Sequence, residues 1–486
     1  MTDADGRHPR PLTRIVATLG PRTDSPLVLR RTIAAGTSIV RLNFSHGSLD
    51  DHAERLAAVR AVETELGVAV AVLGDLRGPR IRIGRVAPRG VRLRVGEEVE
   101  FRGQASAGRR TAAVLPVTEP RILEDLRVGH RVLIADGTIR LRVLRASRGR
   151  ATASVEVGGI VHAGKGLNLP DSRVSLPLLG AHEEDCTRWA VASRLDFLAM
   201  SFVRHAEDLR SLRRLIDRCG GRRSGWRPQI VAKVERPEAI ESIDSLVRAA
   251  DAVMVARGDL GSEMGLEAVP RLQRRILSAA QACGRPTIVA TEVLASMQRH
   301  AQPSRAEVGD LARAVLDDAD AIMLSGETAV GRHPALVVST AATVLARAEQ
   351  WRAEDARASP TPQSAGRATA ALAHAAWHLA RDLRAVMVLV DARDREIVRE
   401  LGQNGLAVPI VPVGDEPEEI RTLLLHRGVL PLVIPRGIDR EAAVDLARRM
   451  ARDRFGLAAG EGPTVVVGRL VHGGVRPVPP LRGDRR

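Results

Sequence analysis

The segment from Ile230 to Gly261 reads IVAKVE, then a helical spacer, then AVMVARGDLG, and it indicates how the whole chain folds. Two short apolar runs separated by one helix predict a β-strand, an α-helix and a second β-strand. Lys233 and Glu235 stand two residues apart on the first strand, so their side chains share a face. The second run ends in Arg257-Gly258-Asp259. Two carboxylates beside a lysine and a glycine turn suit a divalent cation with a phosphoryl group next to it.

Lys-x-Glu on a strand is, taken alone, more typical of a solvated face. The rest of the chain changes this interpretation, because apolar runs alternate with helical patterns from Thr13 to about Glu349. The runs are TRIVATL, SIVRLN, VAVAVLGD, DFLAMSF, IVAKVE, AVMVARGD, TIVATE and AIMLSGE. Eight strands with helices between them predict an α/β fold, a (β/α)8 TIM barrel. A doubly wound open sheet is the alternative, and both the strand count and the polar residues that end each run favour the barrel.

The barrel pattern is interrupted by a segment with a period of two, which predicts an inserted small all-β lid domain at the catalytic end. A Pro/Ser/Ala-rich linker and a C-terminal α/β domain follow the barrel. The predicted order is barrel (1–83), β lid (84–163), barrel (164–350), linker (351–367) and C-terminal domain (368–486).

Composition narrows the class of protein. The 73 basic and 58 acidic residues leave a net charge of +15, yet aromatic residues make up 2% and there is no tyrosine, so platforms for stacking nucleic-acid bases are nearly absent. We expect no nucleic-acid partner.

The three cysteines form no CxxC pair. No apolar run approaches the roughly 20 residues of a membrane span, and the N-terminus lacks a signal region. We therefore expect a cytoplasmic protein without a membrane partner.

Five motifs carry a resemblance to a known family. They are RLNFSHG (residues 41–47), KVE (233–235), MVARGDLG (254–261), PSRAE (303–307) and MLSGET (323–328). In this order and spacing the chain resembles pyruvate kinase from about Thr13 to Pro334, β lid included. The resemblance implies phosphoryl transfer from phosphoenolpyruvate to ADP, giving pyruvate and ATP, in a magnesium-dependent glycolytic enzyme. It also implies a homotetramer.

Site residues follow from the same resemblance, position by position. Glu235 and Asp259 match ligands of a divalent metal, Mg²⁺ or Mn²⁺. Lys233 matches the residue that stabilises the transferred phosphoryl group. The remaining matches are Arg41 for the substrate phosphate, Gly258 and Asp259 for the substrate carboxylate, Thr291 for proton delivery to the enolate carbon, and Asn43, His46, Arg82 and His182 for the nucleotide.

Two departures from the family pattern affect these expectations. Positions matching a potassium site are Asn43, Ser45, Asp75 and Leu76, but the glutamate usual beside them is Arg80 here. A fixed guanidinium repels K⁺ and supplies its charge, so we expect that K⁺ is not required. His182 stands where the family has a lysine. Two alternatives stay open: a pyruvate kinase-like scaffold with lost or altered activity, and a metal-dependent barrel lyase or aldolase acting on pyruvate-type enolates.

Overall fold

The computed structural model describes residues 10–79, 81–103, 113–135, 137–221, 225–355, 368–403, 405–455, 462–471 and 473–478. At its centre, eight parallel strands close into a barrel. They are β1 (Arg14–Thr18), β2 (Ile39–Asn43), β3 (Ala71–Leu76), β12 (Phe197–Met200), β13 (Gln229–Val234), β14 (Ala252–Ala256), β15 (Thr287–Ala290) and β16 (Ala321–Leu324). The predicted TIM barrel is confirmed, and each of the eight apolar runs forms one of these strands.

Alternation along each strand divides the barrel into two apolar layers. On β13, Val231 packs in the cluster that fills the barrel interior, whereas Ile230, Ala232 and Val234 join the layer beneath the surrounding helices. Successive strand side chains point to opposite faces, so this division requires no special sequence device. Consequently Lys233 shares the inward face with Val231.

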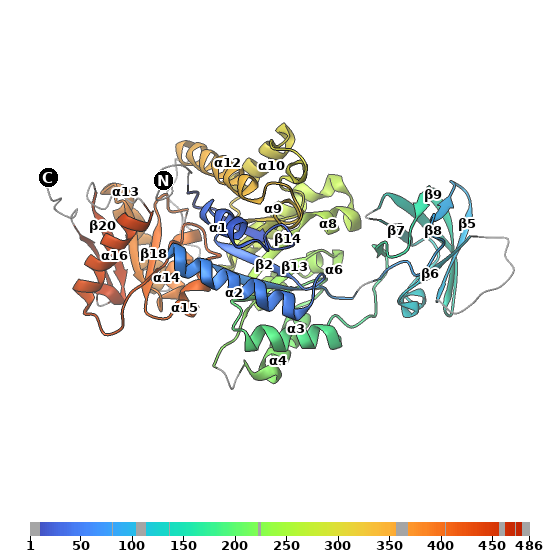
Figure 1. Cartoon of the computed structure of the whole chain (residues 1–486), viewed down its shortest axis with the longest axis horizontal. Helices are drawn as coiled ribbons and strands as arrows, with labels where there is room; N and C mark the ends of the chain where they lie inside the picture. Colours follow the sequence, from blue (N-terminus) through green and yellow to red (C-terminus); the bar gives the residue numbers. More distant parts are fainter. Residues whose placement is uncertain are drawn as a thin grey trace.

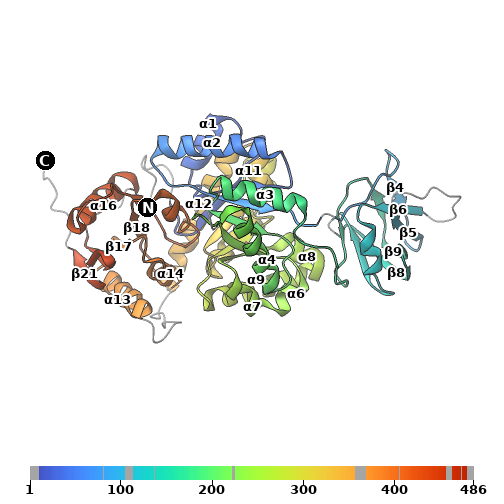
Figure 2. The same ribbon diagram turned by 90° about the horizontal axis from the view of Figure 1, so that it is seen from below.

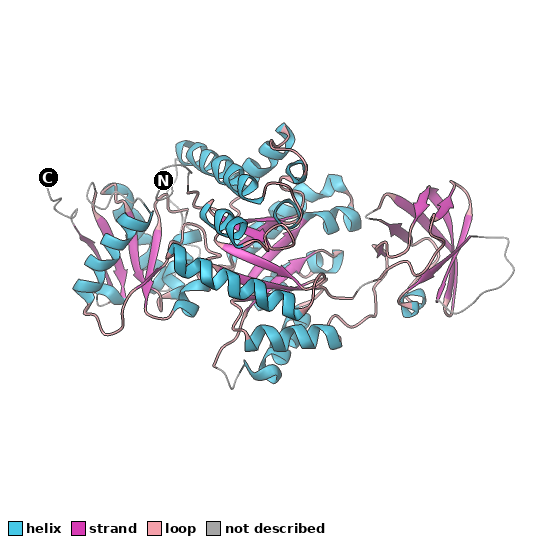
Figure 3. Ribbon diagram, viewed as in Figure 1, coloured by secondary structure: helices cyan, strands magenta, loops and turns pink. Residues whose placement is uncertain are grey.

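The helices surround the barrel (Figure 1, Figure 3). Ahead of the insert and directly after it come α1 (Pro26–Ala34), α2 (Leu49–Leu66), α3 (Ala181–Ala192), α4 (Ala206–Ile216), α6 (Pro237–Glu241) and α7 (Ile243–Ala249). The later ones are α8 (Arg257–Met264), α9 (Val269–Ala282), α10 (Arg305–Leu316), α11 (Gly326–Ala329) and α12 (Pro334–Asp355).

The PSRAE motif has a structural role at the start of α10. Ser304 and Glu307 form a capping box, in which the serine hydroxyl accepts from the Glu307 N–H and the glutamate accepts from the Ser304 N–H. The same carboxylate accepts from the Ser296 N–H at 2.7 Å and from its hydroxyl at 2.5 Å. Glu307 thus ties α10 to the loop that follows β15.

The β insert forms its own sheet and core. Its six-stranded sheet has the order β11-β7-β8-β9-β5-β6, beside a two-stranded sheet β10-β4. The strands are β4 (Val91–Leu93), β5 (Glu98–Gly103), β6 (Ala113–Val117), β7 (Arg131–Ile134), β8 (Ile139–Ser147), β9 (Arg150–Val157), β10 (Gly159–Val161) and β11 (Leu167–Asn168). Because β11 pairs with β7, strand pairing reaches beyond residue 163.

A mixed α/β sheet forms the C-terminal part, in the order β19-β18-β17-β20-β21. Its strands are β17 (Met387–Asp391), β18 (Ile410–Gly414), β19 (Leu432–Val433), β20 (Thr464–Gly468) and β21 (Gly474–Val478), and its helices are α13 (Ala368–Asp382), α14 (Arg395–Gln403), α15 (Pro417–Arg421) and α16 (Arg440–Phe455). This part and the β insert lie at opposite ends of the barrel (Figure 1, Figure 2). The domain limits given above stay a prediction.

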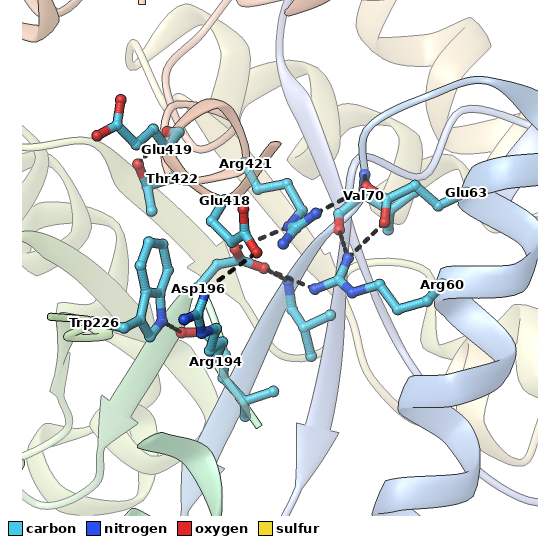
Figure 4. A network of polar contacts seen from close by, with 12 residues as sticks. Arg60, Glu63, Val70, Arg194, Asp196, Trp226, Glu418, Glu419, Arg421 and Thr422 are labelled. Atoms are coloured by element: carbon cyan, nitrogen blue, oxygen red, sulfur yellow. Dashed lines mark hydrogen bonds and ion pairs between the residues drawn. The ribbon is translucent and has the colours of Figure 1, made fainter. Parts of the chain in front are cut away.

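The C-terminal part closes the amino end of the barrel. Leu424 and Leu425 belong to the same apolar cluster as the inward-facing strand residues. Beside them, Arg421 donates to the Oδ1 atom of the fully buried Asp196 at 3.1 Å, and Arg60 lies 3.4 Å from Oδ2 (Figure 4). The Val72 N–H also donates to this carboxylate, at 2.7 Å. Apolar and ionic contacts therefore join the two parts.

A pH dependence of stability is expected at the same interface. Burial lowers the pKa of His426, and the guanidinium groups of Arg395, Arg399 and Arg285 lower it further, to about 3. The histidine is neutral in the folded chain and titrates near pH 6.5 when unfolded, so its stabilisation is complete above pH 6.5 and is lost as the pH falls from there toward 3. Between pH 7 and 5.5 the free energy of unfolding should fall by about 1 kcal/mol on its account.

Urea denaturation at pH 7 and at pH 5.5 measures this loss in the free energy of unfolding. His426→Gln should lose less stability than the parent protein over that range, and the exposed His300→Gln should behave like the parent. Identical losses in His426→Gln and the parent would contradict the expectation.

None of the helices in the described part of the chain combines the length and apolar character needed to cross a membrane.

Candidate active site

Strand alternation directs three charged side chains into the open, carboxyl end of the barrel. Arg41, Asp75 and Lys233 each lie two residues beyond a side chain that packs in the barrel interior. Those interior residues are Ile39, Leu73 and Val231. Since β2, β3 and β13 all run in the same direction, the charged groups emerge at one rim.

The Lys233 ammonium is held by three neighbours. Its Nζ atom lies 2.7 Å from Ser201 Oγ, 3.1 Å from Glu235 Oε1 and 3.3 Å from Asp75 Oδ1. Burial alone would lower the pKa of Lys233, but the charges of Asp75 and Glu235 outweigh burial and raise it to about 12. The lysine therefore keeps its positive charge at neutral pH.

Arg41 is anchored by the same carboxylate. Its Nε atom donates to Asp75 Oδ2 at 2.7 Å and its Nη1 atom donates to Thr18 Oγ1 at 3.1 Å. Burial would raise the pKa of Asp75, but the charges of Lys233 and Arg41 lower it below its usual value. Asp75 thus stays ionised and positions two cationic groups side by side.

The charge of Asp259 acts on the buried carboxyl of Glu235. Burial raises the pKa of Glu235 to about 7; the charge of Asp259 adds to the effect and that of Lys233 opposes it. One Glu235 oxygen also accepts from the Phe202 N–H at 2.7 Å, where Phe202 has a φ of 58°. A carboxylate whose ionisation is opposed by burial and by a second carboxylate nearby fits a site for a divalent cation.

The loop after β15 holds Thr291 in an unusual conformation. Thr291 and Glu292 have φ values of 70° and 51°. Positive φ is uncommon for residues other than glycine, is rarest for a β-branched residue such as Thr291, and occurs often at functional sites. The Thr291 hydroxyl accepts from the Gly258 N–H at 2.8 Å and donates to Ala290 O at 2.6 Å. The Gly258 N–H expected to bind a carboxylate is therefore engaged by Thr291 in this structure.

A cavity of about 300 Å³ lies beside these groups, between the rim and the base of the β insert. Its walls include Asn43, Ser45, His46, Arg82, Arg204 and Asp259. Three of the residues expected near the nucleotide therefore share one cavity with a residue expected at the metal.

His182 stands apart from this cavity. It lies on α3, where its Nε2 atom is 3.2 Å from Phe44 O and 3.5 Å from Cys186 Sγ. Its role at the nucleotide stays a prediction that the geometry does not favour. Arg80, the expected substitute for potassium, lies outside the described residues.

Sequence reasoning gave no role to three residues that the structure places in or beside the site. Ser201 links Lys233 to the carbonyl of Leu76, to which its hydroxyl donates at 2.6 Å. Arg236 lines the cavity and pairs with Glu263 at 3.0 Å. Arg257 donates to Thr291 O at 2.7 Å. Ser201 and Arg257 carried a usable signal, because each directly follows a buried strand.

Comparisons with known proteins identify the family of this chain. Residues 10–338 match the model of the pyruvate kinase barrel domain. A pyruvate kinase of Mycobacterium tuberculosis is 35% identical over 468 residues, which is 94% of this chain and 97% of that protein. Pyruvate kinase II of Salmonella typhimurium is 34% identical over 465 residues, covering 94% and 95%.

A crystal structure of a pyruvate kinase from Cryptosporidium parvum superposes with a TM-score of 0.88 at 28% identity, covering 97% of this chain and 96% of that one. The match includes the barrel, the β insert and the C-terminal sheet. On the family model and on identity over nearly its whole length, this chain belongs to the pyruvate kinase family.

Proposed function

We propose that this protein is a pyruvate kinase that transfers the phosphoryl group of phosphoenolpyruvate to ADP, yielding pyruvate and ATP. The observation that carries the proposal is the placement of the Lys233 ammonium 3.1 Å from Glu235, at a rim that also presents Arg41 and Asp259. Pyruvate release from phosphoenolpyruvate in the presence of ADP and Mg²⁺ tests it directly.

Glu235 and Asp259 would hold the divalent cation, Mg²⁺ or Mn²⁺. The raised pKa of Glu235, caused by burial and by the Asp259 charge, supports this assignment because a bound cation relieves that repulsion. When bound, the ion polarises the oxygens of the substrate and neutralises charge that develops on them.

The protein's own groups provide the remaining electrostatics. Lys233 is charged and is fixed between Asp75 and Ser201. It faces the phosphoryl group during transfer and stabilises its equatorial oxygens in the transition state. Arg41, held by Asp75, binds the substrate phosphate before transfer. Neither cation has to reorganise during the reaction, since both are anchored before substrate arrives.

The enolate left by transfer needs a proton. Thr291 orients the water molecules that deliver this proton to the enolate carbon. The water relay supplies the proton, because a threonine hydroxyl is a weak acid. The Gly258 and Asp259 N–H groups at the start of α8 suit the substrate carboxylate, for which Thr291 would release the Gly258 N–H. Asn43, His46 and Arg82 face the nucleotide phosphates from the cavity wall.

Arg257 is expected to be a positioning residue for Thr291. Its Nη2 atom donates to Thr291 O at 2.7 Å and to Glu292 O at 3.3 Å, while Nη1 lies 2.5 Å from Asp310 Oδ2. Lysine keeps the charge but cannot span these partners. Arg257→Lys should therefore lower kcat by about 10- to 100-fold through misplacement of Thr291.

Two measurements separate positioning from general damage. The half-saturating Mg²⁺ concentration should stay unchanged in Arg257→Lys, and exchange of the pyruvate methyl protons with D₂O should fall along with kcat. Arg248→Lys, at an exposed arginine, is the matched control. Proton exchange at the rate of the parent protein would rule out the positioning role.

The enzyme is expected to work without potassium. The oxygens that match the family's potassium site already accept from protein donors: Asn43 Oδ1 from the Ser45 N–H at 3.0 Å and Leu76 O from Ser201 at 2.6 Å. Both Asp75 oxygens face cationic side chains. Exchanging Na⁺ for K⁺ should change kcat/KM by no more than about two-fold, because fixed guanidinium charge replaces the ion.

Initial rates with Na⁺, K⁺ or tetramethylammonium as the sole monovalent cation check this expectation. A large activation that only K⁺ produces would refute it, and Arg80→Glu should create such an activation.

The family resemblance also supports a homotetramer. Size-exclusion chromatography with light-scattering detection measures the molar mass and tests this expectation.

A further inference from the structure

Two histidines on the surface of the C-terminal part are arranged like metal ligands. His374 and His378 stand four residues apart on α13, so their rings lie on one face of the helix. Their Nε2 atoms are 3.0 Å apart and their ring centroids 4.4 Å apart. The opposite face of α13 packs through Ala373, Ala376 and Ala380 against the sheet, which leaves the histidine rings partly exposed.

The nitrogen separation indicates which ions fit. At a metal–nitrogen bond of about 2.1 Å, two nitrogens lie about 3.0 Å apart across a right angle and about 3.4 Å apart across a tetrahedral angle. The observed 3.0 Å is the length of a hydrogen bond between the two rings, and it also equals the separation of neighbouring positions in tetragonal geometry, so little movement is needed to bind an ion of that preference. That geometry is preferred by Cu²⁺ and Ni²⁺ rather than by Zn²⁺.

The neighbours of the pair define how its protons are placed. Arg381 Nη2 lies 3.4 Å from His378 Nδ1, so this nitrogen accepts, and His378 carries its proton on Nε2 and donates it to His374 Nε2. His374 then has its proton on Nδ1, which is buried with no partner among the described residues. His374 Nε2 is therefore unprotonated, and its lone pair, which accepts the proton of His378, points toward the space between the rings.

Arg381 competes with a metal ion. Binding through His378 Nε2 would move the proton of this ring to Nδ1, where it meets the arginine. Arg381 is exposed and has other partners, since its Nε atom donates to Asp382 at 2.9 Å and its guanidinium lies 5.0 Å from the centre of the Trp377 ring. Displacing it costs one weak contact, and removing it should strengthen binding.

We propose that His374 and His378 form a two-imidazole site for a divalent transition-metal ion of tetragonal preference, Ni²⁺ or Cu²⁺, with water in the remaining positions. The site is separate from the proposed active site, because α13 lies in the part of the chain that closes the opposite end of the barrel (Figure 1). It uses nitrogen ligands, whereas the acidic pair at the rim suits hard cations.

The test uses the full-length chain without a polyhistidine tag, with Mg²⁺ in excess to occupy the acidic pair. Ni²⁺ alone is the probe, because Cu²⁺ would oxidise the three thiols. Calorimetric titration should show one site. Quenching of Trp377 fluorescence reports on it, since this ring lies 5.0 Å from His378.

Four variants decide the outcome. His374→Ala and His378→Ala should each weaken Ni²⁺ binding more than about ten-fold, since loss of an outer-shell partner alone costs about 10- to 100-fold. His300→Ala, at an exposed histidine elsewhere, should bind like the parent protein. Arg381→Gln should bind more tightly, a gain that misfolding cannot imitate.

Equal Ni²⁺ affinity in the parent and both histidine variants would overturn the proposal, as would weaker binding in Arg381→Gln. Pyruvate release should be unchanged in all four variants, so failure of this site and failure of the proposed activity are distinguishable.

Discussion

Lys233→Met is expected to lower kcat by about 10³-fold, which corresponds to about 4 kcal/mol of lost transition-state stabilisation. The ammonium is the cation that contacts Glu235, Asp75 and Ser201 at once, so no neighbouring group can take its place. Methionine keeps an unbranched apolar side chain as far as the ε position and removes the terminal ammonium, with its charge and its donors. Pyruvate release in a coupled assay measures the effect.

Lys233→Arg separates charge from geometry. A planar guanidinium cannot place its charge at the compact point between these three oxygens, so we expect nearly as large a loss as with methionine. The chain otherwise uses arginine almost throughout, with lysine at only residues 165 and 233, which agrees with a specific need for an ammonium here. Arg188→Met, at an exposed ion pair, should leave kcat unchanged.

The outcomes bear on the alternative functions. Equal rates in the parent protein and Lys233→Met would end the assignment of Lys233 to phosphoryl transfer. Absence of pyruvate from the parent itself would favour a lyase or a scaffold without activity. Circular dichroism and thermal unfolding should show that the methionine variant keeps its fold.

Asp196→Ala is expected to destabilise the protein by about 3 kcal/mol, because it leaves the buried guanidinium of Arg421 without its main partner. Burial raises the pKa of Asp196, and the charges of Arg421 and Arg60 oppose this rise, so the two arginines stabilise the ionised carboxylate. The network joins Asp196, the residue before β12, to α15, and its loss should loosen the C-terminal part from the barrel (Figure 4).

Urea denaturation checks this prediction. Asp185→Ala is the matched control, since its ion pair with Arg188 at 2.8 Å is exposed and should contribute less than about 1 kcal/mol. In Asp196→Ala/Arg421→Met the unpaired charge is absent, so part of the stability should return. If Asp196→Ala and Asp185→Ala unfold at the same urea concentration, the buried network contributes no more to the free energy of unfolding than an exposed ion pair does.

Most of the fold could be predicted because it depends on local pattern. All eight apolar runs became barrel strands, and the period-two segment became a separate β core. The contribution of Leu424 and Leu425 to the barrel interior could not be predicted, since these leucines resemble any other buried pair in the C-terminal part. Long-range packing leaves no periodic signal within one element.

The candidate site also has features that the sequence predicted and features that it did not. The period of a strand placed Lys233 and Glu235 on one face, and parallel strand ends placed Arg41 and Asp75 at the same rim. The local sequence left two features undecided, the anchoring of both cations by one Asp75 carboxylate and the support of Thr291 by Arg257. Each joins residues at least 34 positions apart.

By itself, then, the sequence determined the barrel, the β insert and the face on which the charged groups lie, because alternation and strand direction are properties of short segments. The tertiary structure alone decided which donor meets which acceptor, and so which groups stay charged. Distances between elements and the exclusion of water arise only when the whole chain has packed.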